Sequence, residues 1–132
     1  MKYIFDSSSI FKAIKENRIE LLIEGCTLEL ARYEVANIIW KEQNLHKKIN
    51  SEEAKTLLKT IKNILDKIET LKIECKEEQI LETANTTKIT FYDAAYAYIA
   101  KEKNLILVTE DEALKNKISS NIRTAKIENL TE

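Results

Sequence analysis

Short, continuous apolar runs and longer segments with helical spacing divide the 132-residue chain. The runs at 2–5 and 105–108 have strand length and are rich in aromatic or branched residues, which predicts two buried strands. A further short edge strand is expected within 121–127. Apolar stripes at helical spacing predict helices that start at Ile10 and that span, approximately, 18–24, 27–43 (with a brief extended piece at 27–28), 50–72, 76–85, 90–103 and 111–117.

Strands separated by helical stretches predict an α/β fold: a central, mostly parallel sheet between two helical layers. The chain has one Gly and no Pro, so it is poor in the turn-forming residues that sandwiches and barrels use. Its length suits one compact domain, and we expect residues 1–132 to form a single helix-rich domain.

Charge balance and the lack of targeting patterns limit the partners and the cellular compartment that we expect for this protein. Lys and Arg number 21 against 22 Asp and Glu, so no overall positive field attracts nucleic acid, and binding requires a local patch or a bound cation. No signal-peptide pattern opens the sequence, and no apolar run approaches the length of a membrane span. We therefore expect a soluble, cytoplasmic protein without a membrane partner, in which Cys26 and Cys75 are buried, reduced thiols.

Three aspartates share a predicted location at one edge of the sheet. Asp6 directly follows the first strand, Asp111 follows the 105–108 strand, and Asp93 begins the helix that leads into that strand. A helix entering a parallel strand has its N-terminus at the strand's carboxyl end, where α/β proteins place their sites. Each aspartate alone is explained as a helix-start residue; Asp93, for example, lies three residues after Thr90.

Glu34 is a fourth acidic candidate. It lies at the rim of an apolar stripe, and Asn37 shares that rim. A carboxylate drawn toward the interior needs a partner, and a salt bridge to Arg32 or Lys41 is the ordinary alternative. Unit charges about 5 Å apart repel by roughly 3 kcal/mol at an effective dielectric of 20, so an acidic cluster favours a divalent cation. All-oxygen ligands suit Mg²⁺ or Mn²⁺.

Four local patterns together resemble the PIN-domain family and, within it, the small archaeal VapC-type toxins. In chain order they are Asp6-Ser7-Ser8, Glu34-Val35-Ala36-Asn37, Tyr92-Asp93-Ala94-Ala95-Tyr96, and Leu107-Val108-Thr109-Glu110-Asp111. The third and fourth patterns carry the resemblance most specifically.

The resemblance implies a PIN-like fold and a toxin of a type II toxin–antitoxin system: an endoribonuclease that hydrolyses RNA phosphodiesters with a water activated by Mg²⁺ or Mn²⁺. It implies catalysis and metal binding by Asp6, Glu34, Asp93 and Asp111, with one or two ions left open. Supporting roles fall to Ser7, Asn37, Thr109 and Glu110, and Glu110 is an alternative ligand beside Asp111. The implied partners are RNA, a small antitoxin protein and a second copy in a homodimer.

Single residues after the first strand argue against two other protein families. A haloacid-dehalogenase-type phosphatase needs an aspartate where Ser8 stands, and a receiver domain needs one where Ser7 stands. A housekeeping PIN nuclease for RNA processing and a non-catalytic protein-binding domain on the same scaffold remain alternatives. Tyr33 and Trp40 predict an exposed aromatic surface for a dimer or antitoxin. Candidate cations for guiding RNA are Lys12, Lys15, Arg32, Lys41 and Lys88.

Overall fold

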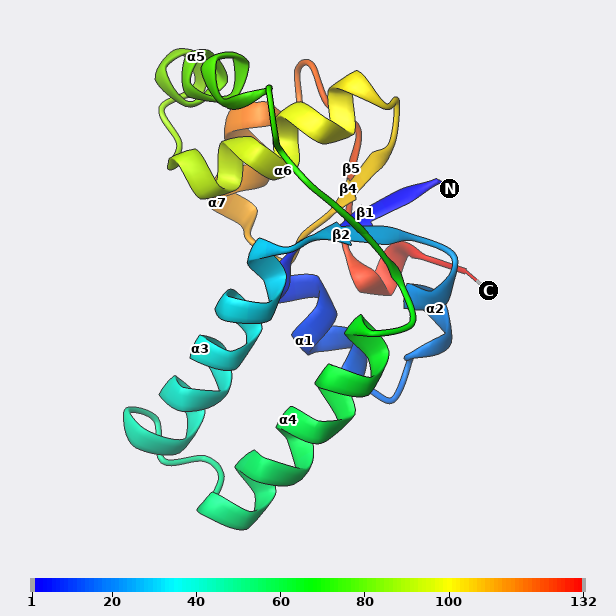
Figure 1. Ribbon diagram of the computed structural model, residues 1–132, viewed down its shortest axis with the longest axis vertical. Helices are drawn as coiled ribbons and strands as arrows, with labels where there is room; N and C mark the ends of the chain where they lie inside the picture. The colour runs from blue at the N-terminus through cyan, green and yellow to red at the C-terminus, as the bar shows by residue number, and fades with distance from the viewer. Residues whose placement is uncertain (1, 132) are drawn as a thin grey trace.

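A parallel sheet of five strands forms the centre of the molecule in the computed structural model, which describes residues 2–131 (Figure 1). The strand order across the sheet is β3-β2-β1-β4-β5. The strands are β1 (Tyr3–Phe5), β2 (Cys26–Leu28), β3 (Glu69–Leu71), β4 (Ile106–Val108) and β5 (Thr124–Ala125). Strands β2 and β3 lie on one side of β1, and β4 and β5 lie on the other, so the order in which the chain adds strands reverses between β1 and β4. The crevice beyond such a switch point is where α/β folds bind ligands.

Helices cover both faces of the sheet. On one side lie α5 (Glu77–Thr87), α6 (Phe91–Glu102) and α7 (Glu112–Ile118), at the top of Figure 1. The other side carries α1 (Ser7–Lys15), α2 (Glu20–Ile23), α3 (Leu30–Asn44), α4 (Ser51–Leu65) and the 3₁₀ turn η1 (Ile127–Asn129). The predicted α/β fold, three layers with a parallel sheet, is therefore confirmed.

Adjacent strand residues face opposite layers, which explains why the strands read as continuous apolar runs. Ile4 and Leu107 are in register and pack with α5, α6 and α7. Phe5 and Val108, the next pair, pack with α1, α3 and α4. All four side chains are fully buried. Because both faces are covered, no polar residue alternates with them.

The one glycine stands where a side chain has no room. Gly25 precedes β2, and a Cβ at this position would collide with the ring of Phe5 and lie 2.9 Å from the carbonyl oxygen of Tyr3. The glycine therefore lets β2 approach β1 at the centre of the sheet, where Ile4 and Cys26 are paired.

Two sequence predictions for residues 50–75 were wrong. The helix expected over 50–72 ends at Leu65, and Glu69–Leu71, expected to be its last turn, form β3 instead. The apolar stripe continues through Ile68, which is buried, so helical periodicity hid the end of the helix. Cys75, expected to be buried, is exposed, whereas Cys26 is buried as predicted.

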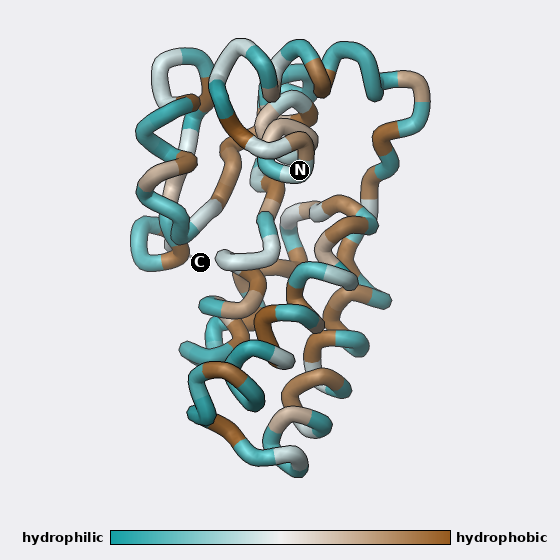
Figure 2. Tube along the Cα trace, turned by 90° about the vertical axis from the view of Figure 1, so that its left-hand side faces the viewer, coloured by the Kyte–Doolittle hydropathy of each residue, from teal (hydrophilic) through white to brown (hydrophobic). Residues whose placement is uncertain are grey.

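Helices α3 and α4 form an antiparallel pair that extends away from the sheet (Figure 1). Hydrophobic positions follow the strands and the inward sides of the helices, and the outward turns are mostly hydrophilic (Figure 2). Helix α4 starts with a capping box in which Asn50 and Glu53 hydrogen-bond each other's backbone N–H groups. Within residues 2–131, no helix has the length and apolar character needed to cross a membrane.

Candidate metal and nucleic-acid site

Asp6 lies at the carboxyl end of β1 and caps the N-terminus of α1. One of its oxygens, Oδ1, accepts hydrogen bonds from the Ser9 backbone N–H at 2.9 Å and from the Ser8 hydroxyl at 2.8 Å. The side chain is 5% exposed. Burial raises the pKa of Asp6, while hydrogen bonds from Thr109, Ser9 and Ser8 act in the opposite direction. Asp6 is therefore both the helix cap that the sequence predicted and a buried carboxyl group at the end of the central strand.

Ser8 and Thr109 join the two central strands at this edge. The Ser8 hydroxyl accepts the Glu110 N–H at 3.0 Å and lies 3.4 Å from Thr109 Oγ1. Thr109 Oγ1 in turn accepts the Asp111 N–H at 3.1 Å. The loop after β4 is thus fixed to the loop after β1, so that Asp6 and Asp111 are delivered to the same edge.

Asp111 and Asp93 lie at the N-terminal ends of two helices, α7 and α6, and these ends are directed at the same edge. Asp111 caps α7 by accepting the Leu114 N–H at 3.1 Å. Asp93 lies in the first turn of α6, whose cap is Thr90; the Thr90 hydroxyl accepts the Asp93 N–H at 3.1 Å. The Asp93 carboxylate is therefore free of the capping role. Burial raises its pKa first, and repulsion from Asp111 raises it further.

Glu34 reaches the same region from α3. Its Oε1 accepts the hydroxyl of Tyr96 at 3.0 Å, rather than pairing with Arg32 or Lys41. Burial raises the pKa of Glu34, and the charges of Asp6 and Asp93 raise it further, against hydrogen bonds from Tyr96 and Ser7. Glu34 therefore lies close enough to two of the aspartates for mutual repulsion.

The carboxyl groups form a string in space rather than a tight cluster. Electrostatic repulsion couples Asp6 with Glu34, Glu34 with Asp93, and Asp93 with Asp111. Among the described residues, no three acidic, His or Cys side chains are close enough together to hold a metal ion as they stand. The donor chemistry nevertheless fits a hard cation, because all the groups are oxygen donors. Burial raises the pKa of Asp6, Glu34 and Asp93, and neighbouring carboxylates raise the pKa of Glu34 and Asp93 further.

The supporting residues expected from the sequence have different surroundings. Ser7 lies near Glu34 and lowers its pKa, and Thr109 accepts the Asp111 N–H, so both lie beside the carboxyl groups. Glu110 turns away, because its Oε2 accepts the Ile127 N–H at 2.9 Å and ties η1 to the loop after β4. Asn37 is exposed on the outer face of α3.

Sequence reasoning assigned no site role to Tyr96 and, of the serines after Asp6, it named Ser7 rather than Ser8. Ser8 stands two residues after Asp6, and Tyr96 stands one helical turn after Asp93, so their spacing was the available signal. Lys117 was also missed; its positive charge lowers the pKa of Asp93. None of these could be separated by sequence from ordinary capping, core and surface residues.

Basic side chains gather on the α1 side of the site. Lys12 and Lys15 line a hollow of about 480 Å³ together with Ser8 and Phe11, and Lys15 Nζ lies 5.7 Å from the centre of the Phe11 ring. Lys12 is paired with Glu16 at 2.8 Å. Arg32, another expected cation, is held at 2.8 Å by Asp66. Glu16 and Glu110 also line the hollow that starts at Ser8, so its charge is mixed.

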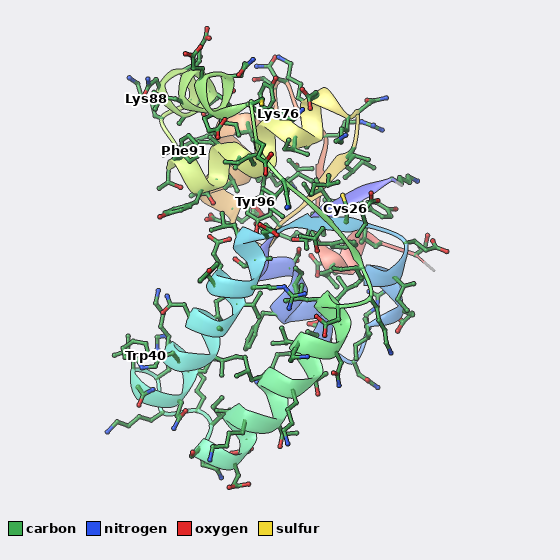
Figure 3. All side chains as sticks on the ribbon, viewed as in Figure 1. Cys26, Trp40, Lys76, Lys88, Phe91 and Tyr96 are labelled. Atoms are coloured by element: carbon green, nitrogen blue, oxygen red, sulfur yellow. The ribbon has the colours of Figure 1, made fainter. Side chains whose placement is uncertain are left out.

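A second hollow, of about 290 Å³, lies one helical turn from Glu34 and is largely apolar. Leu28, Leu71 and Phe91 are among its walls, and Phe91 lies at the start of α6 (Figure 3). Its charged lining is mostly acidic and consists of Glu29, Glu74 and Glu77 against Lys72. This side of the site therefore differs in charge from the α1 side.

Comparison with known proteins identifies the family. The PIN domain model matches residues 2–118. The chain is 32% identical over 116 residues to the protein named Exonuclease VapC9 of Pyrobaculum aerophilum, covering 86% of this chain and 84% of that one. The crystal structure of PAE2754 from the same organism aligns with a TM-score of 0.80 at 27% identity, over 98% of this chain and 92% of that one.

A more distant likeness concerns the fold alone. The crystal structure of VapBC2 from Rickettsia felis, bound to a DNA fragment from their promoter, aligns with a TM-score of 0.65 at 18% identity. The alignment covers 96% of this chain and 98% of that one. With the matched family model and the VapC9 relative, the resemblance seen in the sequence is confirmed, and the chain belongs to the PIN-domain family.

Proposed function

We propose that this protein is a Mg²⁺- or Mn²⁺-dependent endoribonuclease that acts as the toxin of a type II toxin–antitoxin system. The observation that carries the proposal is the string of mutually repelling carboxyl groups at the carboxyl edge of the sheet, with Asp6 buried at one end of the string. Membership of the PIN-domain family and the similarity to the protein named Exonuclease VapC9 support a nuclease activity.

The chain's own residues would hold the cation through carboxylate oxygens of Asp6, Glu34, Asp93 and Asp111. A divalent cation, when bound, lowers the pKa of a coordinated water and neutralises phosphate charge. Asp6 is suited to be a fixed ligand, since Ser8 and Ser9 hold one of its oxygens. We infer that Asp93, whose side chain does not cap α6, turns toward the ion, away from Thr90 and Lys117, which interact with it in this structure.

Proton transfer and strand binding fall to neighbouring groups. Burial raises the pKa of Glu34, and repulsion from Asp6 and Asp93 raises it further. In this proposal Glu34 is the carboxylate that accepts a proton from the attacking water. Lys12, Lys15 and Phe11 offer two cations and an aromatic ring in the hollow next to Ser8. Cations with an aromatic platform are the usual elements for binding a single strand.

Cleavage of defined RNA tests this proposal. We expect wild-type protein with Mn²⁺ to cut a single-stranded RNA, EDTA to stop the reaction, and Asp6→Asn or Asp93→Asn to reduce the rate at least 100-fold. Asp66→Asn is the matched control, because Asp66 is exposed and pairs with Arg32 and Lys62 outside the site. A circular RNA and a DNA of the same sequence complete the set.

The outcomes separate the alternatives. Cutting of the circle demonstrates internal cleavage, whereas cutting of the linear RNA alone indicates exonuclease action, as the name of the relative states for that protein. Unchanged cleavage in Asp6→Asn or Asp93→Asn refutes the site. If wild type with Mn²⁺ cuts no nucleic acid, and Asp93→Asn alters neither metal affinity nor thermal stability, the non-catalytic binding domain is the better interpretation.

We also propose two protein partners. The apolar hollow with Glu29, Glu74 and Glu77 at its rim suits a basic antitoxin segment with an apolar anchor, and its position beside Glu34 lets such a segment cover the site.

Tyr33 and Trp40 are 79% and 52% exposed, and Trp40 projects outward from α3 (Figure 3), which favours a homodimer contact. A strict monomer at high concentration in sedimentation counts against the dimer. A genome neighbourhood without an antitoxin-like reading frame favours a housekeeping PIN nuclease.

A further inference from the structure

Tyr96 buries a hydroxyl next to the acidic site. The residue is 1% exposed, and its hydroxyl donates to Glu34 Oε1 at 3.0 Å. Its ring lies in the core formed by the strands with α5, α6 and α7. A phenylalanine would present the same apolar ring to that core, so the contribution specific to tyrosine is the hydroxyl. A buried hydroxyl requires a partner, and here the partner is a carboxylate of the proposed metal site.

The hydrogen bond crosses between two helices that belong to opposite layers. Tyr96 lies on α6, three residues after Asp93, whereas Glu34 lies on α3. Helix α3 packs mainly against α1 and α4, on the far side of the sheet from α6. In Figure 3 the Tyr96 label lies between α6 and the beginning of α3. One helix therefore supplies both Asp93 and the donor that holds Glu34.

The direction of the bond fixes the orientation of the carboxylate. A donor on Oε1 restricts rotation about the terminal torsion of Glu34, which is otherwise soft. Asp6 and Asp93 repel Glu34, so the bond from Tyr96 holds this carboxylate beside other negative charges. Groups that hydrogen-bond metal-binding carboxylates commonly set the orientation of those ligands.

We propose that Tyr96 is a positioning residue of the acidic site, whose hydroxyl orients Glu34 toward the cation and fixes α3 relative to α6. The inference rests on the proposed metal-dependent function. It does not make Tyr96 a catalytic residue, because the hydroxyl contacts a protein carboxylate.

Mn²⁺ affinity of Tyr96→Phe, measured by calorimetry, tests the inference. We expect the affinity to fall roughly 10-fold or more, the lower end of what the loss of such a supporting group costs. Tyr98→Phe is the matched control: it lies on the same helix and also donates to a glutamate, Glu102 at 3.2 Å, but on the surface and away from the site. We expect this variant to bind Mn²⁺ as wild type does. Affinity of Tyr96→Phe within 2-fold of the control overturns the inference.

Two further readouts distinguish positioning from a general loss of structure. Removal of the Tyr96 hydroxyl should leave Mn²⁺ affinity unchanged when Glu34 is already replaced by Gln, since the donor then has no ligand to orient. Saturating Mn²⁺ should restore the RNA cleavage rate of Tyr96→Phe to within a few fold of wild type. Equal losses of affinity in both backgrounds, or a rate that excess Mn²⁺ does not restore, refute positioning.

Failure of the inference can be told from failure of the proposed function. Coupling between Tyr96 and Glu34 in Mn²⁺ binding, in a protein that cuts no RNA, retains the positioning role and refutes the nuclease. Cleavage that is lost in Asp93→Asn but unaffected in Tyr96→Phe at limiting Mn²⁺ retains the nuclease and refutes the positioning role. A wild-type chain that binds no Mn²⁺ overturns both.

Discussion

Replacing Asp93 by Asn should stabilise the protein in EDTA and destabilise it, relative to wild type, in saturating Mn²⁺. Asp93 is repelled by Asp111 and by Glu34. Unit charges about 8 Å apart repel by roughly 2 kcal/mol at an effective dielectric of 20. Solvent screening of partly exposed groups reduces each repulsion to about 1 kcal/mol. The lost attraction of Lys117 and the lost negative charge in the first turn of α6 together cost about 0.3–1 kcal/mol. The net expectation is a gain of about 1–2 kcal/mol.

Thermal unfolding followed by circular dichroism measures this change. A gain of 1–2 kcal/mol raises the midpoint by about 3–10 °C for a domain of this size. Mn²⁺ at 100 times its dissociation constant stabilises the wild type by about 2.7 kcal/mol and stabilises a variant that lacks one ligand by less. Asp93→Asn should therefore have the higher unfolding midpoint in EDTA, and wild type should have the higher midpoint in Mn²⁺.

The pH dependence has a defined sign. The pKa of Asp93 is raised in the folded state, so the native protein binds this proton more tightly than the unfolded chain does. As the pH falls through the raised pKa toward the ordinary value of 3.8, wild type gains stability relative to Asp93→Asn, and the difference disappears. A variant that is less stable than wild type in EDTA at neutral pH, or a difference that grows as the pH falls, would refute the proposed repulsion.

Two further substitutions test contacts outside the proposed chemistry. Glu110→Ala leaves the Ile127 N–H without its acceptor, so urea unfolding should show a loss of about 1–3 kcal/mol while Mn²⁺ affinity stays within 2-fold of wild type; a 10-fold loss of affinity would make Glu110 a ligand. Gly25→Ala forces a methyl group against the Phe5 ring, and we expect a loss of about 1–3 kcal/mol by the same measurement; an unchanged midpoint would mean that β1 and β2 separate without cost.

Much of the fold was predictable because several helix starts have a local capping signal. Thr90 and Asp111 cap helices at the positions that the sequence indicates. Continuous apolar runs identified the two central strands, which are buried on both faces. The edge strands β3 and β5 were harder to predict. They are two or three residues long and only partly buried, so they leave little or no pattern of their own.

The sequence by itself placed three of the acidic residues at one edge of the sheet. Asp6, Asp93 and Asp111 are placed by strand ends and helix starts, and in a parallel α/β sheet such positions converge on one edge whatever the details of packing. What each side chain does there was decided by the tertiary structure. Glu110 is adjacent in sequence to Asp111, yet its carboxylate is directed to Ile127, 17 residues further on.

Long-range register decided the remaining contacts. The bond from Tyr96 to Glu34 joins residues 62 apart, and the contact of Ser8 with Thr109 joins residues 101 apart. Periodicity assigns a residue to a face of its own helix, but it carries no information about which residue of another layer lies opposite. A tyrosine in an apolar stripe and a serine after a cap therefore read as core and turn residues until the packing of α3, α6 and the central strands brings their hydroxyls to the carboxylates.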